Sequence, residues 1–243
     1  MNYHWNWHIF LEPAPDGTGT YLDMLLSGLL LTIETAICAW IIALVFGSVI
    51  GVLRTLPSKI ASWIGFVWVE FFRNIPLLVQ LFLWFFVLPE LLPPSWGLWL
   101  KQIHHAPFYT ATIGFGLFMS ARIAEQLRAG IGSLPRGQML AATALGLTTM
   151  QAYRYVLLPM AFRIIMPPLT SEFLATIKNT SVAITIGLVE LTGEARSMQE
   201  FSFQVFEAFT AATLLYLLVN IVVVTAMRFL ERSLAVPGYI TGK

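Results

Sequence analysis

The apolar residues of this sequence are gathered into long stretches that short polar segments separate. A helix that crosses a membrane needs about 20 mostly apolar residues. Stretches of that length run over residues 22–53, 60–88, 108–131, 164–189 and 205–230. The pattern therefore predicts an all-α, polytopic membrane protein with about five transmembrane helices.

The composition supports a membrane setting. Hydrophobic residues make up 57% of the 243 residues and charged residues 11%, whereas a soluble domain carries roughly 25% charged residues. A soluble fold of this size could not bury so much apolar surface, so we expect lipid to cover part of it. The net charge of +1 provides no basic surface for a nucleic acid.

The basic residues predict how the chain is oriented, because cytoplasmic loops are enriched in Lys and Arg. With five spans, this rule places the N-terminus outside and the C-terminus inside. We expect an external segment over residues 1–21, one transmembrane domain over 22–232 with a cytoplasmic loop at 132–162, and a cytoplasmic tail over 233–243. The basic residues of the cytoplasmic side are Arg54, Lys59, Arg128, Arg136, Arg154, Arg163, Arg228, Arg232 and Lys243, against Lys101 and Arg196 outside.

The cytoplasmic loop predicts two short helices. Residues 138–144 are rich in helix-forming Ala, Leu and Met, Gly146 interrupts them, and residues 148–158 form a second helical stretch. Pro159 is expected to end it, because helices usually stop before a proline. The apolar side chains of such a loop must be covered, either by the protein's own spans or by a partner that receives them as a helix in a groove.

Charged residues within the spans are candidates for a transport pathway. A charge at the bilayer centre costs at least ~2.5–3.5 kcal/mol, so such residues face a bundle interior or a path. Glu70 with Arg73, and Arg122 with Glu125, are three residues apart and share a helix face. Each pair could either neutralise itself or line a path. The charges are Glu34, Glu70, Arg73, Arg122, Glu125, Glu172 and Lys178.

Pro76 is expected to kink the second span close to Arg73. It removes the hydrogen bond that an N–H at this position would donate to the Phe72 carbonyl. Interrupted helices beside charges often form the binding sites of transporters, although kinks also serve packing alone.

The sequence lacks the motifs of ATP binding and enzyme catalysis. It has no G-x-x-x-x-G-K-[ST], no H-E-x-x-H, no CxxC and no nucleophile elbow. We therefore expect no catalytic residue, bound cofactor or metal, and an energy source on another subunit. The alternatives are an ion-coupled secondary transporter, for which an internal inverted repeat would be expected, and a structural membrane subunit without a path.

The cytoplasmic loop resembles the EAA loop of permeases from binding-protein-dependent ABC importers. The run Leu140-Ala141-Ala142-Thr143-Ala144-Leu145-Gly146 and the later Leu158-Pro159 carry the resemblance, with Leu140 where the family usually has Glu. In that family the loop forms a coupling helix on the ATP-binding subunit. The resemblance assigns coupling to Gln138, Leu140, Ala141, Ala142, Leu145, Gly146 and Leu147.

Further motifs resemble the permeases of polar amino acid importers, of the histidine and glutamate type, over residues 22–232. They are the run at residues 72–80, Glu125 with Arg128, Pro167-Pro168-Leu169 and Lys178-Asn179-Thr180-Ser181. The resemblance implies the type I permease fold. The substrate path that it implies contains Arg73, Asn74, Pro76, Gln80, Arg122, Glu125, Lys178, Asn179, Thr180 and Ser181.

Two positions in the resemblance bear on the substrate. Related permeases for basic or neutral amino acids often carry Asp in place of Asn179 and an aromatic or small residue in place of Arg122. Both differences make the path more positive, which favours glutamate or aspartate over glutamine and other polar amino acids.

The resemblance also implies an assembly in the bacterial inner membrane. The expected partners are a pair of cytoplasmic ATP-binding subunits that hold ATP and Mg, a second permease that is a paralogue of this chain, and a periplasmic amino-acid-binding protein.

Overall fold

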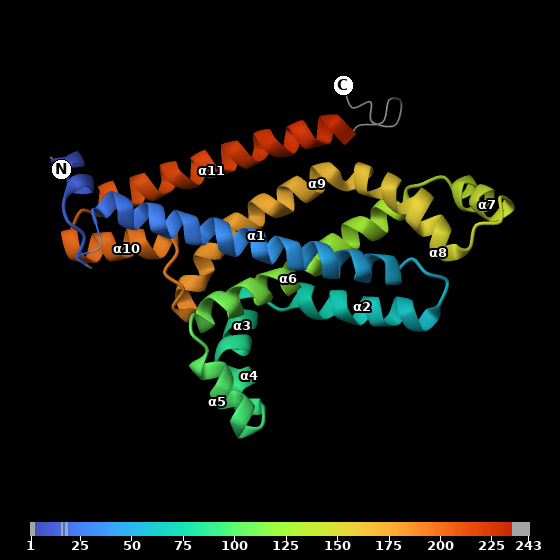
Figure 1. The fold of residues 1–243 in the computed structure, drawn as a ribbon, viewed down its shortest axis with the longest axis horizontal. Helices are drawn as coiled ribbons and strands as arrows, with labels where there is room; N and C mark the ends of the chain where they lie inside the picture. The colour runs from blue at the N-terminus through green and yellow to red at the C-terminus, as the bar shows by residue number, and fades with distance from the viewer. Residues whose placement is uncertain (1–2, 16, 18, 235–243) are drawn as a thin grey trace. The chain divides into compact units, whose positions relative to one another are not determined.

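The computed structural model describes residues 3–15, 17 and 19–234, and the regular elements of this part are helices (Figure 1). The predicted cytoplasmic tail over 233–243, including Lys243, lies almost wholly outside the described residues. The elements are η1 (Trp7–Leu11), α1 (Tyr21–Leu53), α2 (Lys59–Asn74), α3 (Leu77–Phe82), η2 (Leu83–Val87), α4 (Leu88–Leu91), α5 (Pro94–Gln102), α6 (Ala106–Gly132), α7 (Arg136–Ala144), α8 (Thr149–Ala152), η3 (Tyr153–Leu157), α9 (Leu158–Asn179), η4 (Thr180–Ile186), α10 (Leu191–Ser202) and α11 (Val205–Leu234).

The chain divides into two compact units, and α1, α6, α9 and α11 pass through both. The first unit comprises the described residues of Met1–Trp40, Pro76–Gly116 and Ala175–Val222. The second comprises those of Ile41–Ile75, Leu117–Leu174 and Val223–Lys243.

Two to four of the predicted spans are found as apolar helices of membrane-crossing length. Among the described residues, α1 and α11 are each long and apolar enough to cross a membrane. Two bent pairs also meet this criterion, α2 with the segment from α3 to α4, and the segment from α8 to η4 with α10. The 27-residue α6 has the length of the remaining predicted span, but it carries Arg122, Glu125 and Arg128.

A kink was predicted at Pro76, but the structure shows a complete interruption of the helix there. Helix α2 ends at Asn74, Ile75 is extended with φ −98° and ψ 127°, and α3 begins at Leu77 with Pro76 as its N-cap. The chain bends by 101° between α2 and the following helical segment, Leu77–Leu91. Proline disfavours the helical conformation in the residue before it, which accounts for the extended Ile75.

The expectation that Pro159 ends a helix is also wrong. The chain widens into a π turn at η3 and continues directly into α9, and the Leu158 N–H donates to the Tyr153 carbonyl. The same arrangement precedes Pro89, where the Leu88 N–H donates to the Leu83 carbonyl. In an α-helix the proline ring would clash with the carbonyl four residues back. The wider π turn before each Leu-Pro pair changes the position of that carbonyl relative to the proline ring.

Each unit has its own packed interior. In the first unit, one apolar cluster joins α1, α10 and α11, and another joins α3, α6 and η4. In the second unit, α1 approaches α6 at Gly47, where an added Cβ would lie 2.7 Å from the Ile123 Cβ. Helix α6 approaches α9 at Gly130, where it would lie 2.6 Å from Ile165 Cγ2. These close contacts hold α6 between α1 and α9, and α6 carries Arg122, Glu125 and Arg128, three of the charges described next.

Candidate functional site

A polar cavity of 480 Å³ lies within the second unit and collects charged residues from three helices. Three of the predicted pathway residues, Arg73, Arg122 and Glu125, line it together. Gln126 was not predicted, although its place one turn after Arg122 on α6 is a signal that the sequence offers. The full lining is Arg73 from α2, Phe118, Arg122, Glu125 and Gln126 from α6, and Glu172 from α9.

Arg122 interacts with Glu172 across the cavity. Its Nη1 lies 3.6 Å from Glu172 Oε2, and Gln126 Nε2 donates to Glu172 Oε1 at 3.1 Å. The guanidinium also lies 5.6 Å from the Phe118 ring centroid. Of the two alternatives for Arg122 and Glu125, the structure does not show mutual neutralisation, because Arg122 pairs with a carboxylate of another helix. Half of the Arg122 side chain remains exposed, so it can still meet a ligand.

Glu125 is compensated by two other arginines. Arg54, just beyond the end of α1, forms an ion pair with it, and Arg128 Nη2 lies 3.1 Å from its Oε2. Glu70 and Arg73 do not neutralise each other either. Glu70 accepts a hydrogen bond from Asn74 Nδ2 at 2.7 Å, and the ion pairs of the described residues do not include Arg73. The cavity thus presents the cation Arg73 and the ion pair of Arg122 with Glu172, while two arginines outside the lining compensate Glu125.

Of the remaining predicted pathway residues, Asn74 lies in the second unit at the end of α2, and the others belong to the first unit. Gln80 and Thr180 are buried, whereas Lys178 is exposed. The Thr180 hydroxyl donates to the Ile177 carbonyl, and that of Ser181 donates to the Lys178 carbonyl, both at 2.8 Å. These hydroxyls therefore bond to the backbone of their own segment. The set in the first unit is Pro76, Gln80, Lys178, Asn179, Thr180 and Ser181.

The predicted coupling segment forms two helices around a glycine turn. Gly146 has a φ of +81°, a value that favours glycine, and the Leu147 N–H donates back to the Ala142 carbonyl at 3.1 Å. Helix α8 then begins with a capping box, in which the Thr148 and Gln151 side chains each accept a hydrogen bond from the backbone of the other residue. The prediction of two helices interrupted at Gly146 is confirmed.

The protein's own helices cover only part of the apolar residues of the coupling segment. Ala142 is buried within the chain. Leu140, Leu145 and Met150 are 70%, 82% and 77% exposed. The described part of the protein thus leaves three large apolar side chains of this segment in contact with solvent.

A buried carboxylate that the sequence did not single out organises the first unit. Glu190 caps α10, and its Oε1 accepts from the backbone N–H of Thr192 at 3.0 Å and of Gly193 at 3.2 Å. Its Oε2 accepts from Thr32 Oγ1 at 3.1 Å and from Tyr216 Oη at 2.6 Å. An acidic residue at the start of a helix is a capping signal, but α10 itself was not predicted.

Comparison with known proteins gives consistent matches. Residues 43–236 match the family described as binding-protein-dependent transport system inner membrane component. The chain is 48% identical over 246 residues to the glutamate/aspartate import permease protein GltJ of Escherichia coli (strain K12), with both chains fully covered. It is 36% identical to the probable amino-acid ABC transporter permease protein PatM of Vibrio harveyi, over 80% of this chain and 84% of that one.

The fold matches a solved structure as well. A crystal structure of an amino acid ABC transporter with histidines superposes with a TM-score of 0.75 at 28% sequence identity, over 88% of this chain and 95% of that chain.

Proposed function

Because this chain belongs to the binding-protein-dependent transport system inner membrane components, we propose that it is the permease through which an ATP-driven importer carries glutamate or aspartate. The chain is an amino-acid ABC importer permease and not an enzyme, and ATP hydrolysis belongs to a partner subunit. This membership favours an ATP-driven importer over an ion-coupled transporter. The acidic substrate and the residues that handle it are the proposal.

The charge arrangement of the polar cavity carries the substrate assignment. An acidic amino acid has two carboxylates and one ammonium group. Arg73 and Arg122 provide two cations for the carboxylates. Glu172 provides an anion for the ammonium group once the substrate replaces its ion pair with Arg122. A volume of 480 Å³ lies within the usual range of about 300–1,000 Å³ for small-molecule sites. The similarity to the glutamate/aspartate import permease is a second, independent support.

The exposed apolar side chains of the coupling segment support a contact through which ATP hydrolysis on a partner drives this permease. We assign Leu140, Leu145 and Met150 to contacts with a cytoplasmic ATP-binding subunit, because apolar side chains on a short helix suit a groove in a partner. Closure of a pair of such subunits on ATP and Mg would move α7 and α8 and switch the path between its two open states.

The rest of the proposed assembly follows the expectations from the sequence. A second, paralogous permease completes the path, and a periplasmic binding protein delivers the amino acid in a bacterial inner membrane. Asn74, Pro76, Gln80, Lys178, Asn179, Thr180 and Ser181 keep their proposed place along that path.

Replacing Arg122 tests the substrate assignment. In proteoliposomes that hold the whole importer, Arg122→Gln should reduce kcat/KM for glutamate uptake at least about tenfold, because a carboxylate loses its charged partner. Arg122→Lys should retain part of the uptake. Arg196→Gln is the control, since this exposed arginine pairs with Glu200 and lies outside the cavity. Equal uptake by the Arg122→Gln and Arg196→Gln variants would overturn the acidic-substrate proposal.

A further inference from the structure

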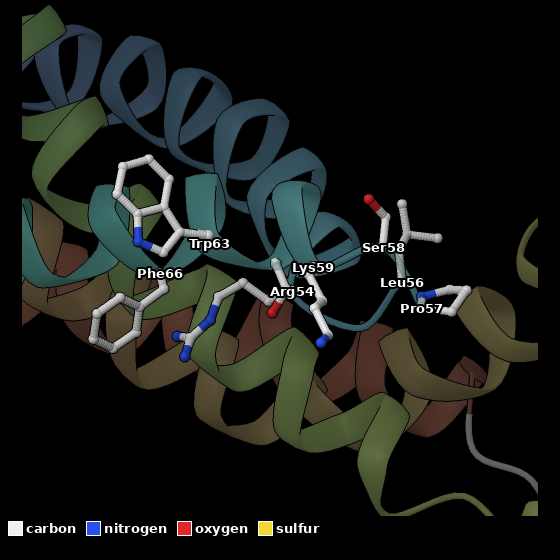
Figure 2. Close-up of a pocket in the computed structure, with 8 residues that line it drawn as sticks. Arg54, Leu56, Pro57, Ser58, Lys59, Trp63 and Phe66 are labelled. Carbon is white, nitrogen blue, oxygen red and sulfur yellow. The ribbon is translucent and has the colours of Figure 1, made fainter.

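A second cavity, of 460 Å³, lies at the turn between α1 and α2 within the second unit. Figure 2 shows the side chains of Arg54, at the end of α1, and Lys59, at the start of α2, on the same side of this turn. Phe66 lies beside the Arg54 guanidinium, 5.8 Å from its Cζ to the ring centroid. The lining residues are Arg54, Leu56, Pro57, Ser58, Lys59, Ser62, Trp63 and Phe66.

Arg54 is held in place as one wall of this cavity. Its aliphatic stem lies over Gly65, where an added Cβ would come within 2.6 Å of the Arg54 Cγ. The guanidinium forms an ion pair with Glu125, and only 14% of the side chain is exposed. The position of this cation is therefore fixed before any ligand arrives.

Positive charge is in excess around the cavity. Burial lowers the pKa of the Arg54 guanidinium, and repulsion from Arg128 and Arg73 lowers this pKa further, while Glu70 opposes the change. Lys59 is exposed and forms no ion pair or hydrogen bond through its side chain within the described residues. Arg54 shares the Glu125 carboxylate with Arg128, so an anion in the cavity would add a partner for Arg54 and provide one for Lys59.

The rim of the cavity is apolar. Ile60 is 74% exposed, Trp63 is 65% exposed and Phe66 is 48% exposed, all on the first turns of α2. In an inner membrane component, exposed aromatic and aliphatic residues beside cations at the end of a span lie where lipid headgroups meet acyl chains. A soluble anion would use the cations but not this rim.

We propose that this cavity binds an anionic phospholipid. Arg54 and Lys59 hold the phosphate, and Trp63 and Phe66 contact the glycerol and the first part of the acyl chains. The site is separate from the polar cavity assigned to the substrate, and its test does not depend on transport.

Lipid titration of the whole importer tests this proposal. The delipidated complex in detergent is titrated with phosphatidylglycerol or phosphatidylcholine, and the lipids bound to this chain are counted by native mass spectrometry. The wild-type protein should bind phosphatidylglycerol in preference. Lys59→Gln should weaken that binding about fivefold, the contribution typical of one basic residue near an anionic membrane surface. Lys59→Arg should preserve it, and so should Arg232→Gln, the loss of an exposed cation at the end of α11.

Several outcomes would overturn the proposal. Equal binding of the two lipids, or equal weakening by Lys59→Gln and Arg232→Gln, would exclude a specific site. Full competition by inorganic phosphate at the lipid's concentration would identify a site for the free anion. Loss of a partner subunit from the Lys59→Gln complex, with phosphatidylglycerol binding unchanged, would identify a protein interface.

Discussion

The Glu190 carboxylate shows how strongly a single residue can determine the packing of a unit. It is fully buried, and it accepts hydrogen bonds from Thr32, Tyr216 and two backbone N–H groups at the start of α10. Four polar groups therefore depend on one side chain for their partners. A buried group that loses its partner costs more than the hydrogen bond itself contributed.

Replacing Glu190 should destabilise the first unit. Glu190→Ala should lower the free energy of unfolding by about 3 kcal/mol, because α10 loses its cap and the Thr32 and Tyr216 hydroxyls lose an acceptor. Glu190→Gln keeps an acceptor for the backbone and should cost less. Unfolding in detergent, followed by circular dichroism, measures both variants. Glu200→Ala, on the exposed face of the same helix, should change stability by less than about 0.5 kcal/mol. Similar losses for Glu190→Ala and Glu200→Ala would contradict this account.

Individual charges could be selected from the sequence, but their partners could not. Any charge within an apolar stretch is costly, so Arg73, Arg122 and Glu125 stand out without a structure. Spacing along one helix reveals only neighbours on that helix. The partner of Arg122 is Glu172 on α9, and a partner of Glu125 is Arg54 beyond α1. Of the two alternatives that the spacing left open, neutralisation of Arg122 by Glu125 and of Glu70 by Arg73 does not occur, because these pairings depend on how separate helices pack.

At the scale of elements, the glycine turn between α7 and α8 should determine how the coupling segment is presented. An added Cβ at Gly146 would meet nothing within 4 Å, so the positive φ is the only obstacle to another residue. Gly146→Ala should cost about 1 kcal/mol, the penalty of a side chain in the left-handed region. ATP-dependent uptake should fall as the turn reorients.

Two variants serve as controls for the turn. Gly146→Asn should recover much of the uptake, because asparagine tolerates the left-handed conformation. Gly137→Ala, within α7, also meets nothing within 4 Å and should be neutral or stabilising by about 0.5–1 kcal/mol. If Gly146→Ala and Gly137→Ala behaved alike, the conformation of the turn would not matter for coupling.

The exposed leucines of the coupling segment should be required for assembly rather than for folding. Leu145→Asp should reduce co-purification of the ATP-binding subunit at least about tenfold, as expected when a charge enters an apolar contact at an interface. The permease itself should remain folded, because Leu145 is 82% exposed. Ser95→Asp, at an exposed position of α5, is the control. Undiminished co-purification of Leu145→Asp would remove Leu145 from the interface.

Elements with a strong local signal were predicted well, and the others were not. The interruption at Gly146 follows from glycine chemistry and is confirmed. Pro159 was expected to end a helix, but a π turn accommodates it, and no residue preference identifies such a turn in advance. Helix α10 was missed because Leu191–Ser202 is short and mixes polar with apolar residues, so it does not resemble a span.

At the scale of the whole molecule, the two compact units are each assembled from three separate parts of the chain. The order of hydrophobic stretches predicted the helical class and the succession of spans. It could not predict which parts of α1, α6, α9 and α11 pack into which unit, because this depends on contacts between residues far apart in the sequence. The division into units, like the polar cavity, became visible only in the folded protein.

Uptake of labelled glutamate by the reconstituted importer tests the central claim most directly. The permease would be incorporated into liposomes with its ATP-binding subunits, second permease and external binding protein, with and without ATP on the side of the ATPases. Excess aspartate, glutamine, arginine or histidine would compete. The account predicts uptake that requires ATP and is blocked best by aspartate. Uptake blocked best by glutamine, arginine or histidine would contradict the acidic substrate, and uptake independent of ATP would contradict the proposed coupling through α7 and α8.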